Sequence, residues 1–238
     1  MIIALESLPT TIAHLRTIAT PVVDHRIMPF GIPALDDRLA SRGLRAGALH
    51  EVAAQSCSLV DDAAATLFLA GIAAREAAHT GGPVLWVSCR NDLYAPGLEQ
   101  AGLSPGDLIH AQPRDDAALL AVVEDAVRDG TPSAVIAEVS RMSMVATRRL
   151  QLVAADADIP VLILRRRRNR DQDPLAEPSA AWTRWRIASA SSERLGVAGV
   201  GRSRWQVEVA RQRGGEAFSM ILEGCDETGC LAVPAALG

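Results

Sequence analysis

Short, uninterrupted apolar segments alternate with helix-length stretches along this chain, and this alternation limits the possible folds most strongly. Segments 84–87, 134–138 and 160–164 are almost wholly apolar, and each is separated from the next by a stretch long enough for a helix. Strands that alternate with such helices need right-handed crossovers, which make neighbouring strands parallel. Because these strands are apolar on both faces, both faces of the sheet should be covered. We therefore predict an α/β fold with a mainly parallel sheet flanked by helices.

The pattern divides the chain into three parts. Residues 1–26 are predicted to hold an amphipathic helix over 6–20 and a linker, and residues 27–168 form the α/β core. The expected core strands are 49–53, 84–87, 108–111, 134–138 and 160–164, and the expected core helices are 34–39, 61–78, 94–101, 115–129 and 143–155. Residues 169–238 begin with a polar loop. They then alternate as an antiparallel pair over 182–189 and 205–213, followed by a last strand over 218–222.

All 24 basic residues are arginine. A mechanism that needs a lysine, such as a lysine on bound phosphates or a Schiff base, therefore cannot run on this chain alone. Residues 141–213 hold 15 arginines against seven acidic residues, whereas residues 1–140 hold nine against 17. This asymmetry favours contact with nucleic acid or an acidic partner, with a solvated arginine-rich surface as the alternative.

The remaining composition excludes several classes of protein. No apolar run reaches the ~18 residues that a membrane-spanning helix needs. The first residues lack the basic and then apolar order of a signal peptide. Four scattered cysteines make neither a disulfide framework nor a metal site. We therefore expect a cytoplasmic protein with reduced thiols, no membrane contact and no metal.

Residues 29–53 carry an ordered motif that is more specific than a lone glycine pattern. Its elements are Gly31, Leu35-Asp36, Leu39, Gly43-Leu44, Gly47 and the strand Leu49 to Val52. This order and spacing resemble the entry to the RecA-like ATPase core, and the resemblance covers residues 27–165. It implies that the strand over 49–53 leads into a phosphate-binding P-loop.

The next segment departs from that pattern. A P-loop reads Gly, four residues, Gly-Lys and then Ser or Thr, so that backbone N–H groups and the lysine hold phosphates. This chain has instead the degenerate P-loop residues Ala54, Gln55, Ser56, Cys57, Ser58, Leu59, Val60 and Asp61. The lysine position falls near Val60 and the hydroxyl position near Asp61. We expect carboxylates to fill the former anion site; a plain structural turn capped by Asp61 or Asp62 is the alternative.

Two other positions of the ATPase machinery point the same way. Arg90 lies nearest to the family's water-orienting glutamate, and Glu138 lies where its magnesium-linked aspartate would be. One acid does not make a catalytic site. We therefore expect no catalytic residues, no nucleotide cofactor and no ATP hydrolysis.

Within the RecA-like proteins, residues 30–36, 47–52 and 205–215 resemble the ImuA family. That resemblance implies an accessory role in SOS-induced, error-prone translesion DNA synthesis after DNA damage. It implies binding to an ImuB-like Y-family polymerase homologue, with an error-prone polymerase alpha subunit as an indirect partner and RecA and single-stranded DNA as further candidates. A weak ATPase or RecA-regulating factor completed in trans, and a SulA-like inhibitor of cell division, are the alternatives.

The candidate DNA- or partner-binding residues are arginines and tryptophans in the basic part of the chain. They are Arg165, Arg166, Arg167, Arg168, Arg170, Trp182, Trp185, Arg204, Trp205, Arg211 and Arg213. The arginine run follows an expected strand directly, at the sheet edge where α/β folds bind ligands. Arginine and tryptophan are also frequent at interface hot spots. The alternatives are a solvated loop for the arginine run and core packing for Trp185 and Trp205. The helix over 6–20 is a second candidate interface.

Overall fold

The computed structural model describes residues 25–167, 169–192, 199 and 201–234. The helices are α2 (Pro33–Asp36), α3 (Leu59–Thr80), α4 (Ala95–Gln100), α5 (Asp116–Asp129) and α6 (Met144–Ala157), with a 3-10 turn over Pro105–Asp107. The strands are β1 (Ile27–Met28), β2 (Leu44–Arg45), β3 (Leu49–Ala54), β4 (Val84–Val87), β5 (Leu108–Ala111), β6 (Ala134–Val139), β7 (Val161–Arg165), β8 (Thr183–Ala190), β9 (Arg204–Gln212) and β10 (Phe218–Glu223). The predicted helix over 6–20 lies outside the described residues.

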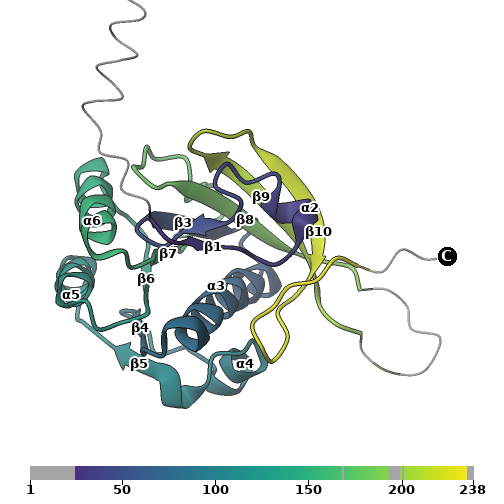
Figure 1. Ribbon diagram of the computed structural model, residues 1–238, viewed down its shortest axis with the longest axis horizontal. Coiled ribbons are helices and arrows are strands. Elements are labelled where there is room, and N and C mark those ends of the chain that lie inside the picture. Colours follow the sequence, from purple (N-terminus) through teal and green to yellow (C-terminus); the bar gives the residue numbers. More distant parts are fainter. Residues whose placement is uncertain (1–24, 168, 193–198, 200, 235–238) are drawn as a thin grey trace, which may run out of the picture.

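Eight of these strands form one sheet, in the order β10-β9-β8-β3-β7-β6-β4-β5 (Figure 1). Strands β3 to β8 run parallel to one another, and β9 and β10 are antiparallel. The α/β fold class is confirmed, and so is the antiparallel pairing near the C-terminus. Strand β8 lies directly beside β3, so the C-terminal strands extend the core sheet.

Helices cover both faces of the parallel part of the sheet (Figure 1). Helix α3 packs on one face, where Phe68 meets Trp185, Phe30 and Trp205 with ring centroids 5.6–6.5 Å apart. Helices α5 and α6 pack on the other face, with Leu119 at the centre of a second core. This double burial is why the parallel strands are apolar on both sides.

Helix α3 begins two residues earlier than the sequence predicts, and its cap is a different residue. Ser58 is the N-cap, and its hydroxyl accepts a hydrogen bond from the Asp61 backbone N–H at 3.2 Å. The prediction that Asp61 or Asp62 caps the helix is therefore wrong. A serine hydroxyl satisfies a first-turn N–H without charge, which leaves both carboxylates for other partners. At the other end, Gly81 stops the helix with a left-handed backbone.

The helix predicted over 34–39 is only the four-residue α2. The Asp36 carboxylate accepts hydrogen bonds from the backbone N–H groups of Phe30 and Ile32, at 2.9 and 3.1 Å. These bonds tie the short helix to the segment that precedes it. None of the helices among the described residues is long and apolar enough to span a membrane.

Candidate functional site

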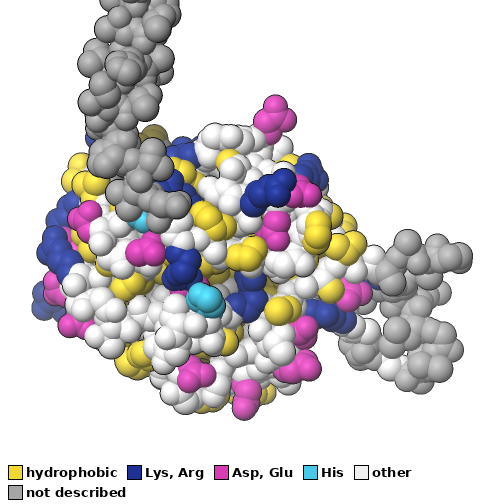
Figure 2. Space-filling view, viewed as in Figure 1, with side chains coloured by type: hydrophobic (Ala, Val, Ile, Leu, Met, Phe, Trp, Pro, Cys, Tyr) yellow, Lys and Arg dark blue, Asp and Glu magenta, His cyan; other side chains and the backbone are white. Residues whose placement is uncertain are grey.

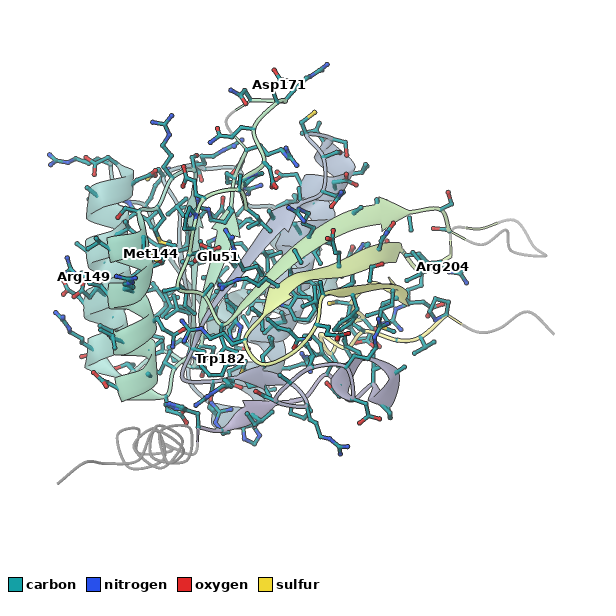
Figure 3. The ribbon with its side chains drawn as sticks, turned by 90° about the horizontal axis from the view of Figure 1, so that it is seen from above. Glu51, Met144, Arg149, Asp171, Trp182 and Arg204 are labelled. Atoms are coloured by element: carbon teal, nitrogen blue, oxygen red, sulfur yellow. The ribbon has the colours of Figure 1, made fainter. Side chains whose placement is uncertain are left out.

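The turn from β3 into α3 is the position of the P-loop in the pattern found in the sequence. It lies at the carboxyl ends of the parallel strands, where α/β sheets bind ligands. Two adjoining cavities open there, of about 230 and 340 Å³. Figure 3 shows Asp171 on the loop that follows β7, standing out from this end of the sheet.

Asp61 joins the start of α3 to the end of β8. One carboxylate oxygen accepts a hydrogen bond from the Ser189 backbone N–H at 2.8 Å, and the other accepts from the Ser56 hydroxyl. Asp61 is buried, so these bonds replace its contacts with water. The carboxylate at the former hydroxyl position therefore holds two strand ends together.

Arg166 lies at the centre of a buried chain of charges. It pairs with Asp62 of α3, and its Nε donates to Glu138 Oε2 of β6 at 2.8 Å. The other oxygen of Glu138 accepts from Trp86 Nε1 at 2.7 Å. Burial opposes the charge on the guanidinium, but the fields of Glu138 and Asp62 outweigh it and raise the pKa of Arg166. The guanidinium thus has two carboxylate partners, the buried Glu138 and the half-buried Asp62.

Arg167 contacts backbone carbonyl groups of the β3–α3 turn. Its guanidinium donates to the Gln55 carbonyl at 2.7 Å and, from the other side, to the Gln172 carbonyl at 2.7 Å. A P-loop turns backbone N–H groups toward an anion. Here backbone carbonyls accept hydrogen bonds from an arginine instead. The turn therefore binds a cationic side chain of the same chain.

In this arrangement the acid at the position of the family's magnesium-linked aspartate has partners within the chain. Glu138, the counterpart of the magnesium-linked acid, accepts from Trp86 and Arg166 and is buried. No group of three or more His, Cys, Asp or Glu side chains that could hold a metal ion occurs among the described residues. Arginines line the solvent-facing rim of the site: Arg90 and Arg170 are exposed, and Arg167 is half-buried.

The arginine run that begins at the last residue of β7 does not form one exposed surface. Arg165 is 2 % exposed; it pairs with Glu177 at 3.0 Å and lies 3.6 Å from Glu51. Arg166 is buried as described above. The expectation that these two arginines face a partner is corrected, because acidic residues of neighbouring elements enclose them. Arg170 is exposed, and Arg168 lies outside the described residues.

The predicted tryptophan and arginine set is also dispersed. Trp185 and Trp205 are buried in the core against Phe68, so core packing is their role and not partner contact. Trp182 is half-buried, with the guanidinium of Arg45 4.1 Å from its ring centroid and that of Arg213 5.2 Å away. Such stacking of cations on an indole is favourable and leaves part of the group at the surface.

The other members of this set, the half-buried Arg204 and the exposed Arg211 and Arg213, do not lie on one patch. Arg204 pairs with Ala190 at one end of the β8–β9 ladder, whereas the Arg213 N–H bonds the Trp182 carbonyl at the other. Figure 3 shows Trp182 and Arg204 far apart on these strands. Arg211 is exposed and donates to the Ala181 carbonyl at 2.6 Å, near the Trp182 end. On the face seen in Figure 2, basic and acidic side chains are interspersed and do not form a single basic field.

Sequence reasoning missed Tyr94, and it named Leu59 and Arg90 without assigning them to these cavities. Leu59, Tyr94 and Arg90 line the larger one, and Leu59 and Tyr94 are strongly exposed. The sequence held one signal of an apolar site here. Leu59 is a large apolar residue in the first turn of the helix that follows a P-loop in the RecA-like pattern. Tyr94 comes from a distant segment, and only the fold brings it near.

The fold matches the crystal structure of the RadB recombinase with a TM-score of 0.57 and 16 % identity, over 87 % of this chain and 99 % of that chain. The chain therefore has a RecA-like α/β fold, and charged side chains lie at the position where the pattern would have a P-loop.

The sequence comparison narrows this class to a family. The chain is 35 % identical over 202 residues to Protein ImuA of Caulobacter vibrioides, from strain NA1000 / CB15N and likewise from strain ATCC 19089 / CIP 103742 / CB 15. The alignment covers 83 % of this chain and 83 % of each relative. No protein-family model matches. The chain belongs to the ImuA family.

Proposed function

We propose that this protein is a non-catalytic accessory factor of inducible, error-prone translesion DNA synthesis. In this proposal it keeps the RecA-like scaffold, has lost nucleotide chemistry and acts by binding an ImuB-like Y-family polymerase homologue. RecA and single-stranded DNA are further candidate partners, and an error-prone polymerase alpha subunit is an indirect one. Membership of the ImuA family supports this mutagenesis role.

One observation carries the non-catalytic part of the proposal. Arg166 bridges Asp62 and Glu138 where a P-loop protein would hold phosphate and magnesium. The acid that would have to serve magnesium is buried and accepts two hydrogen bonds. Freeing it would leave an arginine buried with one partner fewer, which costs several kcal/mol.

A second candidate function has one observation in its favour. Four arginines line the smaller cavity: Arg90, Arg166, Arg167 and Arg170. They could contact a triphosphate if a RecA-type neighbour supplied the catalytic acid. Asp62 lies in the same cavity and repels phosphate, and Arg166 is already neutralised by two carboxylates. We therefore place this candidate second.

Titration with a fluorescent ATP analogue and Mg²⁺ separates the two candidates, with RecA as the positive control. We expect no saturable binding up to about 1 mM, with or without single-stranded DNA. A micromolar Kd would overturn the non-catalytic proposal. Partner binding is tested separately by co-purification with the ImuB-like protein of the same bacterium; absence of a complex would contradict the adaptor role.

A further inference from the structure

The two cavities at the β3–α3 turn adjoin and differ in character. Leu59, Asp62, Arg90 and Arg166 line both of them. The smaller cavity adds arginines from the loop after β7, whereas the larger one lies between α3 and α4 and is mostly apolar. Its further apolar lining comes from Ala63, Leu67, Leu93, Tyr94 and Leu98. Together they form a groove, the α3–α4 groove, with an apolar half and a basic half.

Apolar side chains at this groove are unusually exposed. Leu59 and Tyr94, which line the larger cavity, are 86 % and 71 % exposed. They are two of the nine large apolar side chains that are exposed among the described residues. Single exposed apolar residues need no explanation, but a cluster beside an apolar cavity is typical of a binding site. Leu59 and Val60 also replace the residues that a phosphate-binding turn would carry, so the site has gained apolar surface where it has lost anion-binding groups.

The charged half of the groove favours an acidic ligand. Arg170 and Arg90 are exposed at its rim. Arg90 pairs with Asp92 at 2.7 Å, and both side chains reach solvent. An exposed pair of this kind is worth little, so a partner carboxylate can replace Asp92 at small cost. The buried Arg166 is held by Glu138 and Asp62 in the wall of the groove.

We propose that the α3–α4 groove docks a short segment of a partner protein in which leucine- or phenylalanine-type side chains are flanked by aspartate or glutamate. The apolar side chains enter between α3 and α4 and cover Leu59 and Tyr94. The flanking carboxylates meet Arg90 and Arg170. This inference rests on the proposed adaptor function and names the chemistry of the partner segment.

The lining favours a peptide over a nucleic acid. Sites for single strands use several aromatic side chains as stacking platforms. The apolar half has one aromatic residue, Tyr94, and is otherwise aliphatic.

Fluorescence anisotropy with the full-length protein tests the groove directly. The probe is a fluorescein-labelled peptide of sequence Asp-Glu-Leu-Leu-Glu-Leu-Phe-Asp-Glu. The comparison probes are the same peptide with lysine at every acidic position and a labelled single strand of thymidines. We expect the acidic peptide to bind and both comparison probes to bind at least about tenfold more weakly. Preference for the single strand or for the lysine peptide, or no binding of the acidic peptide up to about 1 mM, would overturn the proposal.

Matched variants locate the binding. Leu59→Asp should weaken the acidic peptide about tenfold, because it removes apolar contact and adds a like charge. Arg170→Glu should weaken it about threefold, with loss of salt dependence. The controls are Leu152→Asp and Arg148→Glu on α6, both at exposed positions. Equal effects of the control variants would overturn the assignment to this groove.

A last comparison separates this inference from the proposed function. Co-purification with the full-length polymerase homologue is repeated with Leu59→Asp. If the homologue binds the wild type and the variant equally, the adaptor function stands and the groove proposal fails. If the homologue binds neither but the acidic peptide shows the expected variant pattern, the groove proposal stands and the proposed partner is wrong. Sedimentation of the same variants tests self-association; a dimer lost on Leu59→Asp would assign the groove to a second copy and overturn the proposal.

Discussion

Arg166 holds one carboxylate oxygen of Glu138 with two nitrogens. Its Nε and Nη2 each lie 2.8 Å from Oε2, and the other oxygen accepts from Trp86 Nε1. Glu138 is the last residue but one of β6, and Arg166 directly follows the neighbouring strand β7, 28 positions further along the chain. This contact places an ion pair where the RecA-like pattern would have a magnesium-linked acid. The contribution of the ion pair to stability can be measured apart from any binding.

Removing the charge of Glu138 should destabilise the fold. Glu138→Gln keeps an acceptor for Trp86 but leaves the buried Arg166 with Asp62 alone, so we expect a loss of about 2 kcal/mol in the free energy of unfolding. Urea denaturation measures it, with the exposed Glu99→Gln as control. The double variant Glu138→Gln, Arg166→Met should recover part of the loss, since no unpaired buried cation remains. A single variant as stable as the wild type would contradict the structural role of this pair.

Substitution of Trp185 should cost more stability than substitution of Trp182, because the first packs in the core and the second lies at the surface. Trp185 is fully buried against Phe68 and Phe30, so Trp185→Ala should cost about 4 kcal/mol of stability. Trp182 is half-buried between two guanidinium groups, and Trp182→Ala should cost about 1 kcal/mol. Thermal and urea unfolding of both variants check this order. A reversed order would mean that the core is arranged differently around β8.

Stability should fall in mild acid because of His50. The ring is buried, its Nε2 faces the Arg45 carbonyl, which calls for a proton on that nitrogen, and its Nδ1 lies 2.7 Å from the Thr183 hydroxyl. Burial lowers the pKa of His50 from 6.5 to about 4. The unfolded chain therefore binds more protons between these values, so the free energy of unfolding decreases as the pH falls from about 6.5 to about 4, by up to ~3 kcal/mol. His50→Gln should flatten this part of the profile; an unchanged profile would show that other groups cause it.

Two neighbouring glycines should respond differently to alanine. Gly102 has φ +91°, and a Cβ there would lie 2.4 Å from the Gly229 backbone nitrogen. Gly102→Ala should therefore cost about 3 kcal/mol, because the left-handed backbone is strained and the segment around Gly229 must move. At Gly106 the nearest atom to a Cβ is the Ser104 hydroxyl at 3.6 Å, and Gly106→Ala should be nearly neutral. Denaturant midpoints compare the two; equal midpoints would refute the close packing near Gly229.

Cys57 should react first among the described thiols and report on the groove. Its side chain is exposed and lines the smaller cavity. In contrast, burial raises the pKa of the Cys225 thiol to about 12, which leaves it almost wholly protonated and slow to react. With DTNB at about pH 8 we expect a fast phase in which one thiol reacts, and this phase should be absent in Cys57→Ser. The acidic peptide should slow that fast phase; unchanged labelling at saturating peptide would show that it binds elsewhere.

The sequence by itself determined the α/β class, most strand positions and the loss of the P-loop. These features are local: β4 and β5 have the predicted bounds because a short apolar run between turn residues is read within a few positions. The missing glycines and lysine before α3 are likewise visible without any structure. Helix ends were less secure, as Ser58 shows, because serine and aspartate compete for the same capping bond.

Tertiary structure alone decided what the arginines and tryptophans do. Arg165 and Arg166 follow one another in a basic run, yet both are buried, because strand order brings Glu51, Glu138 and Asp62 to them from distant segments. Such pairs join residues from 28 to more than 100 positions apart, and no local pattern contains them. The α3–α4 groove has the same origin. Leu59 and Tyr94 lie 35 positions apart in the chain, and they share one cavity because β3 and β4 both end at the same edge of a parallel sheet.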